Sequence, residues 1–335
     1  MDMVNYTLKE EAGFRSKAFL AIATVFLAMA LAAGLVGCTS SDDNGEDSGS
    51  ASSESNSEAD GSDTDADATS EDDASELVEF EEIAVVDNDY VSIVLTGLDQ
   101  DGLFGYTFDV TIVNKSDSVT YMVATDDDCS VDGVQIDPLF AEEVAAGKTA
   151  YSEITIYEDD TLAEAGVAFT DIVLSFHAYD SDDWSADYVV DGESVHVYPY
   201  GEDAATTFVR EAGADDEVLV DNDYVTVTVI GYDPDYDLGY AVELYITNKT
   251  DAEVMVSVDD ASVNGVMCDP YWAASIGAGL NSFETIYWYS SSLEEIGITD
   301  AGSEITEIEF VLSAYNYETF DDYFDDLDIV LSPQD

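Results

Sequence analysis

The sequence offers few side chains for catalysis, and its two histidines are the first to consider. General acid–base catalysis near neutral pH most often uses histidine. His177 follows Phe176 in an alternating apolar run, and His196 lies between Val195 and Val197. We interpret both as surface or edge-strand histidines. No Gly-x-Ser-x-Gly, His-Glu-x-x-His, P-loop or Cys-x-x-Cys motif occurs, so the usual nucleophilic, zinc and phosphate-binding sites lack their residues. We predict no catalytic residue and no enzyme.

Carboxylates are the other candidate chemistry, because 76 of the 335 residues are Asp or Glu. The clusters at 126–128, 180–183 and 321–326 could supply the six to eight oxygen ligands of Ca²⁺. The loop 233–239 resembles an EF-hand loop, but its glycine falls one place late and the twelfth position lacks Glu. We interpret these segments as solvated loops and predict no metal site and no cofactor, with Ca²⁺ binding as the alternative. A carboxylate-based hydrolase is a further alternative, because many acidic pairs exist.

Three cysteines are present: Cys38, Cys129 and Cys268. Cys129 and Cys268 occupy different positions in the two repeats described below, so they do not form a repeated bridge. A disulfide between them would have to link the two repeats. We expect two free, partly buried thiols instead.

The first 38 residues form an export signal. Lys9, Arg15 and Lys17 precede an apolar run at 18–33, and small residues follow before Cys38. The segment Leu35-Val36-Gly37-Cys38 resembles the lipobox of bacterial lipoproteins. The resemblance implies that Cys38 is the lipidation site, thioether-linked to diacylglycerol, and becomes residue one after cleavage. The alternative is an uncleaved membrane helix at 18–37, which is just long enough to span a bilayer. Both interpretations place the rest of the chain outside the cytoplasm.

An acidic tether follows at 38–76. It contains Ser, Asp, Glu, Gly, Ala, Thr and Asn after Cys38, with 14 acidic residues and neither an aromatic nor a basic one. Such a segment buries too little apolar surface to offset its ordering entropy, so we predict a disordered linker. The whole chain has a net charge of −69, which excludes nucleic acid as a partner.

The rest of the sequence consists of two copies of one repeat. The segment Val85–Asp99 matches Leu219–Asp233 at 8 of 15 positions, and Asn-Lys-Ser-Asp, which begins at Asn114, returns as Asn-Lys-Thr-Asp at Asn248. The matches extend over about 120 residues, which indicates a duplicated domain. The second copy has Ser313 where the first has His177, so the repeat does not preserve that histidine.

Alternation of apolar and polar residues predicts strands in both copies. In the first copy Tyr106, Phe108, Val110 and Ile112 share one face, and Asp109 points the other way. The pairs Asp132-Gly133 and Asn264-Gly265 predict two-residue hairpins of type I′. Only 161–166 and 293–297 predict short helical turns. Seven or eight strands in each copy predict an antiparallel β-sandwich. Several of the 21 tyrosines, among them Tyr179, Tyr245 and Tyr315, fall on outward positions and could anchor an interface.

These turn and strand motifs resemble uncharacterised immunoglobulin-like domains of lipoproteins from Gram-positive bacteria. The motifs that support this resemblance are the Asn-Lys-Ser/Thr hairpin, the Ser-Val-Asp/Asn-Gly turn, Ala146-Gly147-Lys148 and the Phe-His-Ala-Tyr-Asp run at 176–180. The resemblance implies a fold and no catalytic residues.

The sequence therefore predicts an all-β protein with five parts. They are a lipoprotein signal peptide (1–37), the lipidated Cys38 with its linker (38–76), a first immunoglobulin-like sandwich (77–200), an interdomain linker (201–216) and a second sandwich (217–335). We expect a lipid-anchored protein on the extracytoplasmic face of the cell membrane, presenting two domains for non-catalytic binding or cell-envelope interaction. The expected partners are the membrane, through the anchor, and a protein or glycan of the envelope. A calcium- or glycan-binding surface module is the alternative.

Overall fold

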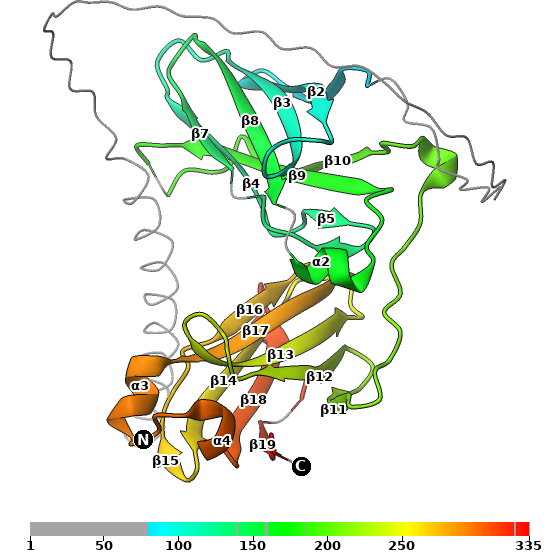
Figure 1. Cartoon of the computed structure of the whole chain (residues 1–335). Coiled ribbons are helices and arrows are strands. Elements are labelled where there is room, and N and C mark those ends of the chain that lie inside the picture. Colours follow the sequence, from blue (N-terminus) through cyan, green and yellow to red (C-terminus); the bar gives the residue numbers. More distant parts are fainter. Residues whose placement is uncertain (1–79, 139, 158–159, 184, 325, 335) are drawn as a thin grey trace, which may run out of the picture. The chain divides into compact units, whose positions relative to one another are not determined.

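Strands make up most of the folded chain, as the alternation of apolar residues predicted. The computed structural model describes residues 80–138, 140–157, 160–183, 185–324 and 326–334. All of them lie within one unit of the chain, Glu71–Asp335. The protein is an all-β, almost entirely antiparallel sandwich fold, which confirms the predicted fold class (Figure 1). The leader, Cys38 and the acidic linker lie outside the described residues.

The first repeat is cyan to green in Figure 1 and pairs two sheets. One has the order β1-β2-β3-β8, and the other has β6-β5-β9-β4-β7 with β10 also paired to β9. The strands are β1 (Ile83–Asp87), β2 (Val91–Asp99), β3 (Gly105–Asn114), β4 (Tyr121–Thr125), β5 (Ser130–Val131), β6 (Val134–Gln135), β7 (Ala141–Val144), β8 (Thr149–Tyr157), β9 (Ile172–Asp180) and β10 (Val190–Val197).

The second repeat follows the same plan. Its sheets have the orders β11-β12-β13-β17 and β15-β14-β18-β19, with β16 paired to β14. The strands are β11 (Glu217–Asp221), β12 (Val225–Asp233), β13 (Gly239–Asn248), β14 (Val254–Val263), β15 (Val266–Met267), β16 (Ala273–Ile276), β17 (Asn281–Tyr289), β18 (Ile308–Asn316) and β19 (Leu327–Leu331).

Short helices interrupt the strands at few places in the described chain. Two of them, α2 (Asp160–Ala165) and α3 (Ser290–Glu295), fall near the predicted helical turns. The helix α4 (Ala301–Glu304) and the 3₁₀ turn η1 (Glu202–Ala204) were not predicted. Each is three or four residues long, which is too short to show a helical period. No helix among the described residues is long and apolar enough to cross a bilayer.

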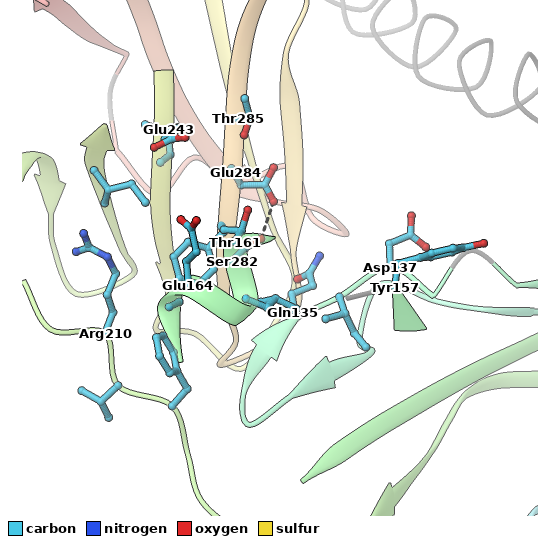
Figure 2. A pocket seen from close by; sticks show the side chains of 18 of the residues that line it. Gln135, Asp137, Tyr157, Thr161, Glu164, Arg210, Glu243, Ser282, Glu284 and Thr285 are labelled. Atoms are coloured by element: carbon cyan, nitrogen blue, oxygen red, sulfur yellow. Dashed lines mark hydrogen bonds between the residues drawn. The ribbon is translucent and has the colours of Figure 1, made fainter. Parts of the chain in front are cut away.

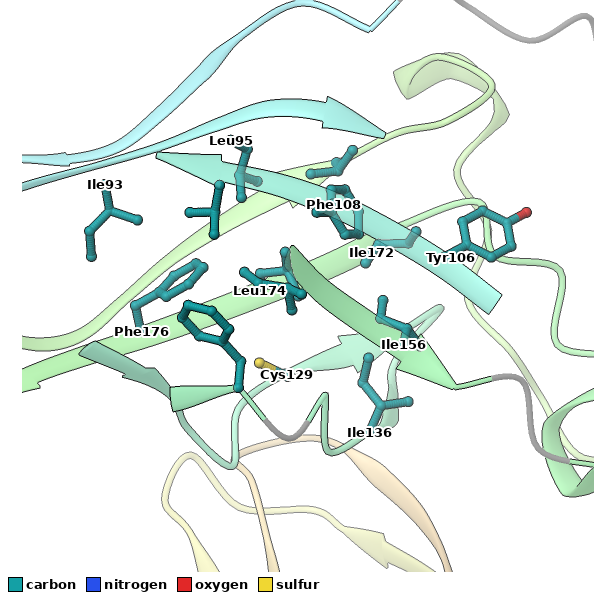
Figure 3. Packing of buried hydrophobic residues seen from close by; sticks show 14 of the residues in the cluster. Ile93, Leu95, Tyr106, Phe108, Cys129, Ile136, Ile156, Ile172, Leu174 and Phe176 are labelled. Atoms are coloured by element: carbon teal, nitrogen blue, oxygen red, sulfur yellow. The ribbon is translucent and has the colours of Figure 1, made fainter. Parts of the chain in front are cut away.

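The predicted inward faces are buried in both repeats. Phe108, Val110 and Ile112 on β3 are at most 1% exposed, and Val242 and Leu244 on β13 are fully buried. The buried apolar side chains form two clusters, one in each repeat, and Figure 3 shows part of the first one. Each fully buried aliphatic or aromatic side chain contributes about 1.5–3 kcal/mol relative to exposure. These faces therefore hold the two sheets of each sandwich together.

The predicted Asp-Gly and Asn-Gly turns are type I′. Asp132 and Gly133 have φ of 51° and 81°, and Asn264 and Gly265 have φ of 52° and 75°. The turn at Asp132 joins the paired strands β5 and β6, and the turn at Asn264 joins β14 and β15. Positive φ at both central positions explains why these residue types recur there.

Backbone pairing also connects the two repeats. Val134 on β6 pairs in parallel with Asn281 on β17. The Gln135 side chain extends the contact: its Nε2 donates to the Ser275 carbonyl (2.7 Å), and its Oε1 accepts the Gly277 N–H (2.8 Å). This parallel pair was not predicted, because the two-residue strand β6 is too short to show a periodic pattern.

Candidate binding surfaces

The two histidines have local partners in the first repeat. The ring of His177 on β9 stacks on Tyr179 and Tyr188, with centroids 5.7 and 5.5 Å away. Burial lowers the pKa of His177. His196 on β10 lies 2.8 Å (Nδ1) from a carboxylate oxygen of Asp171 and is half-exposed. Within the described chain, the partners of these two histidines are tyrosine rings and the Asp171 carboxylate rather than a serine or cysteine side chain.

In two of the acidic clusters, at 126–128 and 180–183, carboxylates accept hydrogen bonds from their own loops. Carboxylates of Asp126 and Asp180 each accept the N–H two residues further on, at 3.1 and 3.0 Å. Asp183 accepts the Ser185 hydroxyl at 2.6 Å. The EF-hand-like loop is the β12–β13 hairpin, in which Asp233 accepts the Asp235 N–H at 2.9 Å. Among the described residues, no group of three or more His, Cys, Asp or Glu side chains could hold a metal ion.

Cys129 and Cys268 are free thiols and are buried. They lie in different apolar clusters, so the expectation of no bridge between them is confirmed. Figure 3 shows Cys129 in the first core near Ile136 and Phe176. Burial raises the pKa of Cys129 to about 12, which keeps it protonated and unreactive at neutral pH.

The three outward tyrosines named from the sequence are covered by neighbours of the same chain. Tyr245 on β13 lies 5.0 Å from the Phe283 ring, and the Arg210 guanidinium lies 5.7 Å from its centroid. Tyr315 stacks on Phe320 at 6.0 Å, and Tyr179 stacks on His177. Each of the three is only partly exposed.

A cavity of about 980 Å³ lies where α2, the segment 208–211 and the strands β13 and β17 meet (Figure 2). Its walls combine apolar side chains, such as Phe208 and Phe283, with the carboxylates of Glu164 and Glu243. Desolvation, Asp233 and Glu164 raise the pKa of Glu243. The volume is at the upper end of the range of small-molecule sites.

Glu284 lines the same cavity but does not join the other carboxylates. Its cross-strand neighbour is the buried Leu244, whereas Glu243 pairs with Thr285. Successive residues of a strand point to opposite faces, so Glu243 and Glu284 lie on opposite faces of their sheet. Figure 2 shows Glu284 with its one drawn partner, the Ser282 hydroxyl, at 2.6 Å. Desolvation raises the pKa of Glu284 to about 7.

Large apolar side chains are exposed at the same end of one sheet in both repeats, which the sequence analysis missed. At this end, which we call the tip, the β2–β3 loop lies beside the end of β8, and the β12–β13 loop lies beside the end of β17. In the first repeat Phe104 precedes β3 and Tyr157 ends β8, and they are 64% and 54% exposed. In the second repeat Leu238 precedes β13 and Tyr289 ends β17, and they are 45% and 49% exposed. The available signal was a large apolar residue directly before a strand-initiating glycine in both copies.

Comparison with known proteins adds no relative: neither a family model nor a curated protein matches this chain. The resemblance to immunoglobulin-like domains of lipoproteins therefore stays an interpretation of the sequence.

Proposed function

We propose that this chain is a lipid-anchored, extracytoplasmic protein that presents two immunoglobulin-like sandwiches for non-catalytic binding at the cell envelope. The observation that carries the proposal is the exposure of Phe104 with Tyr157, and of Leu238 with Tyr289, at the equivalent tips of the two repeats. Exposed rings that the fold does not use are typical of interaction sites. The same feature in two copies favours a role that both copies share.

The anchor rests on the Leu35-Val36-Gly37-Cys38 segment. A protein that carries two or more acyl chains attaches stably to a membrane, whereas a single acyl chain gives only weak, reversible attachment. Metabolic labelling with a clickable fatty acid tests it in the full chain. We expect the label on the unmodified chain and none after Cys38→Ser, which should also leave an unprocessed precursor. Label retained by the Cys38→Ser chain would contradict the anchor.

Site-specific cross-linking tests the binding role. A photo-reactive phenylalanine analogue is placed at Phe104 or Leu238, and at Tyr271 as a control elsewhere in the second repeat that is more exposed than either tip residue. After irradiation of intact cells we expect discrete higher-mass species from the two tip positions and none from Tyr271. Identical patterns at all three positions would contradict a binding role for the tips.

A glycan-binding module is the second candidate, and the cavity of Figure 2 favours it. The rings of Phe208 and Phe283 could stack on a sugar, and the carboxylates of Glu164 and Glu243 could accept hydrogen bonds from its hydroxyl groups. Wall polysaccharide should then raise the melting temperature of the full chain, and Phe283→Ala should abolish that rise. Equal melting temperatures with and without polysaccharide would remove this candidate.

A further inference from the structure

A comparison of the two repeats separates the side chains that stabilise the fold from those that have no structural role. The repeated polar residues are used structurally: Asn88 and Asn222 each accept two backbone N–H groups at 2.8 Å, within their own turns. Asp132 accepts the N–H groups of Thr170 and Asp171, both at 2.9 Å. The exposed apolar residues of the two tips have no comparable role, so their recurrence in both repeats needs another explanation.

In the second repeat the tip carries three tyrosines and a leucine, which we call the second tip cluster: Tyr236, Leu238, Tyr287 and Tyr289. The ring of Tyr287 lies 5.4 Å from Tyr236 and 5.2 Å from Tyr289, in tilted and edge-to-face arrangements. The two hydroxyls of Tyr287 and Tyr289 are 3.3 Å apart. This contact and desolvation raise the pKa of Tyr287 to about 12, so the Tyr287 hydroxyl stays protonated at physiological pH.

The backbone fixes this cluster at the end of the sheet. Gly239 begins β13 with φ of 156°, and a Cβ there would lie 2.0 Å from the Trp288 carbonyl. Leu238 is tied to the next element because the Ser290 N–H donates to its carbonyl at 2.9 Å. The rings are therefore presented on a rigid strand end rather than on a loose loop.

The first repeat has a smaller counterpart, the first tip cluster: Leu103, Phe104 and Tyr157. Leu103 is 90% exposed, and the rings of Phe104 and Tyr157 are 6.3 Å apart. Phe104 precedes Gly105 of β3 as Leu238 precedes Gly239 of β13. Thr155 takes the place of Tyr287 and pairs with Thr107 on β3, so this cluster has fewer rings.

The charged side chains around both tip clusters are negative. Exposed carboxylates lie in the hairpin loops themselves, Asp101 in the first repeat and Asp235 and Asp237 in the second. Lys115 and Lys249 follow the far ends of β3 and β13 and pair there with Asp87 and Asp221.

The other two basic residues of the described chain are also outside the tips. Arg210 pairs with Asp216 at 2.6 Å, and Lys148 precedes the opposite end of β8 from Tyr157. Electron-rich rings beside unpaired carboxylates complement a cation.

We propose that each tip cluster docks a Lys- or Arg-rich segment of a partner polypeptide. The basic head groups lie over the tyrosine and phenylalanine rings and pair with the loop carboxylates, while the aliphatic stems cover Leu103 and Leu238. The inference deepens the proposed binding function and rests on it. Two tips on one chain raise the avidity for a partner that carries two such segments.

Fluorescence anisotropy of the purified full chain with a labelled peptide of alternating Arg and Gly tests the proposal. The measurement is made at physiological ionic strength, where the Debye length is about 8 Å, so that distant charges are screened. The tip variants are Tyr287→Ser with Tyr289→Ser, and Phe104→Ser with Tyr157→Ser. Tyr151→Ser and Tyr271→Ser are matched controls, because these tyrosines are 83% and 89% exposed and lie outside the clusters. None of these changes alters net charge.

We expect the chain that carries both double tip changes to raise the dissociation constant about fivefold or more, with the controls unchanged, because exposed cation–π contacts each contribute a factor of a few. Each double change alone leaves the other tip intact and should lower the amount of peptide bound at saturation. Tyr289→Leu keeps apolar area and packs conservatively, and we expect it to weaken binding as well, since it removes the ring face. A peptide with Gln in place of Arg should not bind.

Tip variants that bind as tightly as the controls would overturn the proposal, because general charge attraction would then explain the binding. A neutral oligosaccharide that displaces the peptide from the tips would overturn it in favour of a glycan. The proposed function fails separately, if the tips yield no cross-linked species in cells. A cross-linked partner that has no Lys- or Arg-rich segment would contradict the docking of a basic segment, but not the proposed binding function.

Discussion

The side-chain amide of Asn114, at the end of β3, donates a 2.7 Å hydrogen bond to the carbonyl of Val144 on β7. The bond joins strands of opposite sheets beside the β3–β4 turn. Asn248 repeats the arrangement in the second copy, where it donates to the carbonyls of Ile276 and Gly277 at 2.9 and 2.8 Å. Both asparagines are 1% exposed. The repeated Asn-Lys-Ser/Thr-Asp motif is therefore a structural clamp.

The clamp predicts unequal effects of neighbouring substitutions. Asn248→Ala leaves several buried carbonyls without a donor, and we expect it to lower the free energy of unfolding by about 3 kcal/mol. Lys249→Met removes an ion pair to Asp221, whose side chain is 64% exposed, and should change the free energy of unfolding much less, because solvent screens the pair. Urea denaturation of the full chain measures both. Equal losses would contradict a structural role for the asparagine.

The alternation of residues and the type I′ turns could be predicted from sequence because they depend on local periodicity and on positive φ. The parallel contact of Val134 with Asn281 could not, because it joins segments far apart in sequence through a single pair. The tip clusters were missed for a related reason. Alternation assigns Tyr157 and Tyr289 a face, but only the folded sheet shows that the ends of β8 and β17 stay uncovered.

Glu284 was identifiable in part, since Ser282 and Glu284 interrupt a face on which Ile286 and Trp288 are apolar. The pattern shows a polar residue on a buried face, but its desolvation depends on the elements packed around it. That environment comes from tertiary structure and could not be predicted from the strand alone.

The pH dependence of stability should report on Glu284. Burial raises its pKa from 4.5 to about 7, so the folded state favours the neutral acid. This contribution is fully present below about pH 4.5 and is lost as the pH rises through 7. Glu284→Gln keeps a neutral side chain and should stabilise the chain at pH 8 by up to about 3 kcal/mol, at about 1.4 kcal/mol per pKa unit. Near pH 4.5 the variant should differ little from the parent.

Denaturation midpoints at the two pH values measure the effect. Glu294→Gln, at an exposed position of α3, is the control, since it removes one negative charge without changing a buried group. A stabilisation by Glu284→Gln that is no larger at pH 8 than that by Glu294→Gln would contradict the buried-acid interpretation.

Removing a hydroxyl should stabilise the first repeat. Ser175 on β9 is fully buried, and its Oγ has no hydrogen-bond partner. The equivalent position of β18 is Val311, so the fold accepts an apolar residue there. Ser175→Ala should raise the free energy of unfolding by about 1 kcal/mol, because an unsatisfied buried polar group costs about 1–3 kcal/mol.

Ser313→Ala on β18 is the contrasting change. Its Oγ lies 2.9 Å from Ser257 Oγ, so the alanine variant loses a bond and should be destabilised slightly. Thermal denaturation distinguishes the two, and a lower melting temperature for Ser175→Ala would contradict the prediction.

We expect salt to stabilise the folded chain by screening the repulsion between its carboxylates, rather than through a cation that binds at a specific site. From residue 77 onward 59 acidic residues face four basic ones, and self-repulsion of this size opposes the folded state. The carboxylates of Asp126, Asp180 and Asp233 are turned to backbone N–H groups of their own loops. We therefore expect the melting temperature to rise with NaCl, and to rise equally with Ca²⁺ and Mg²⁺ at fixed ionic strength. A specific site at 100 times its dissociation constant would add about 2.7 kcal/mol, so a shift of that size with Ca²⁺ alone would contradict screening and restore the calcium hypothesis.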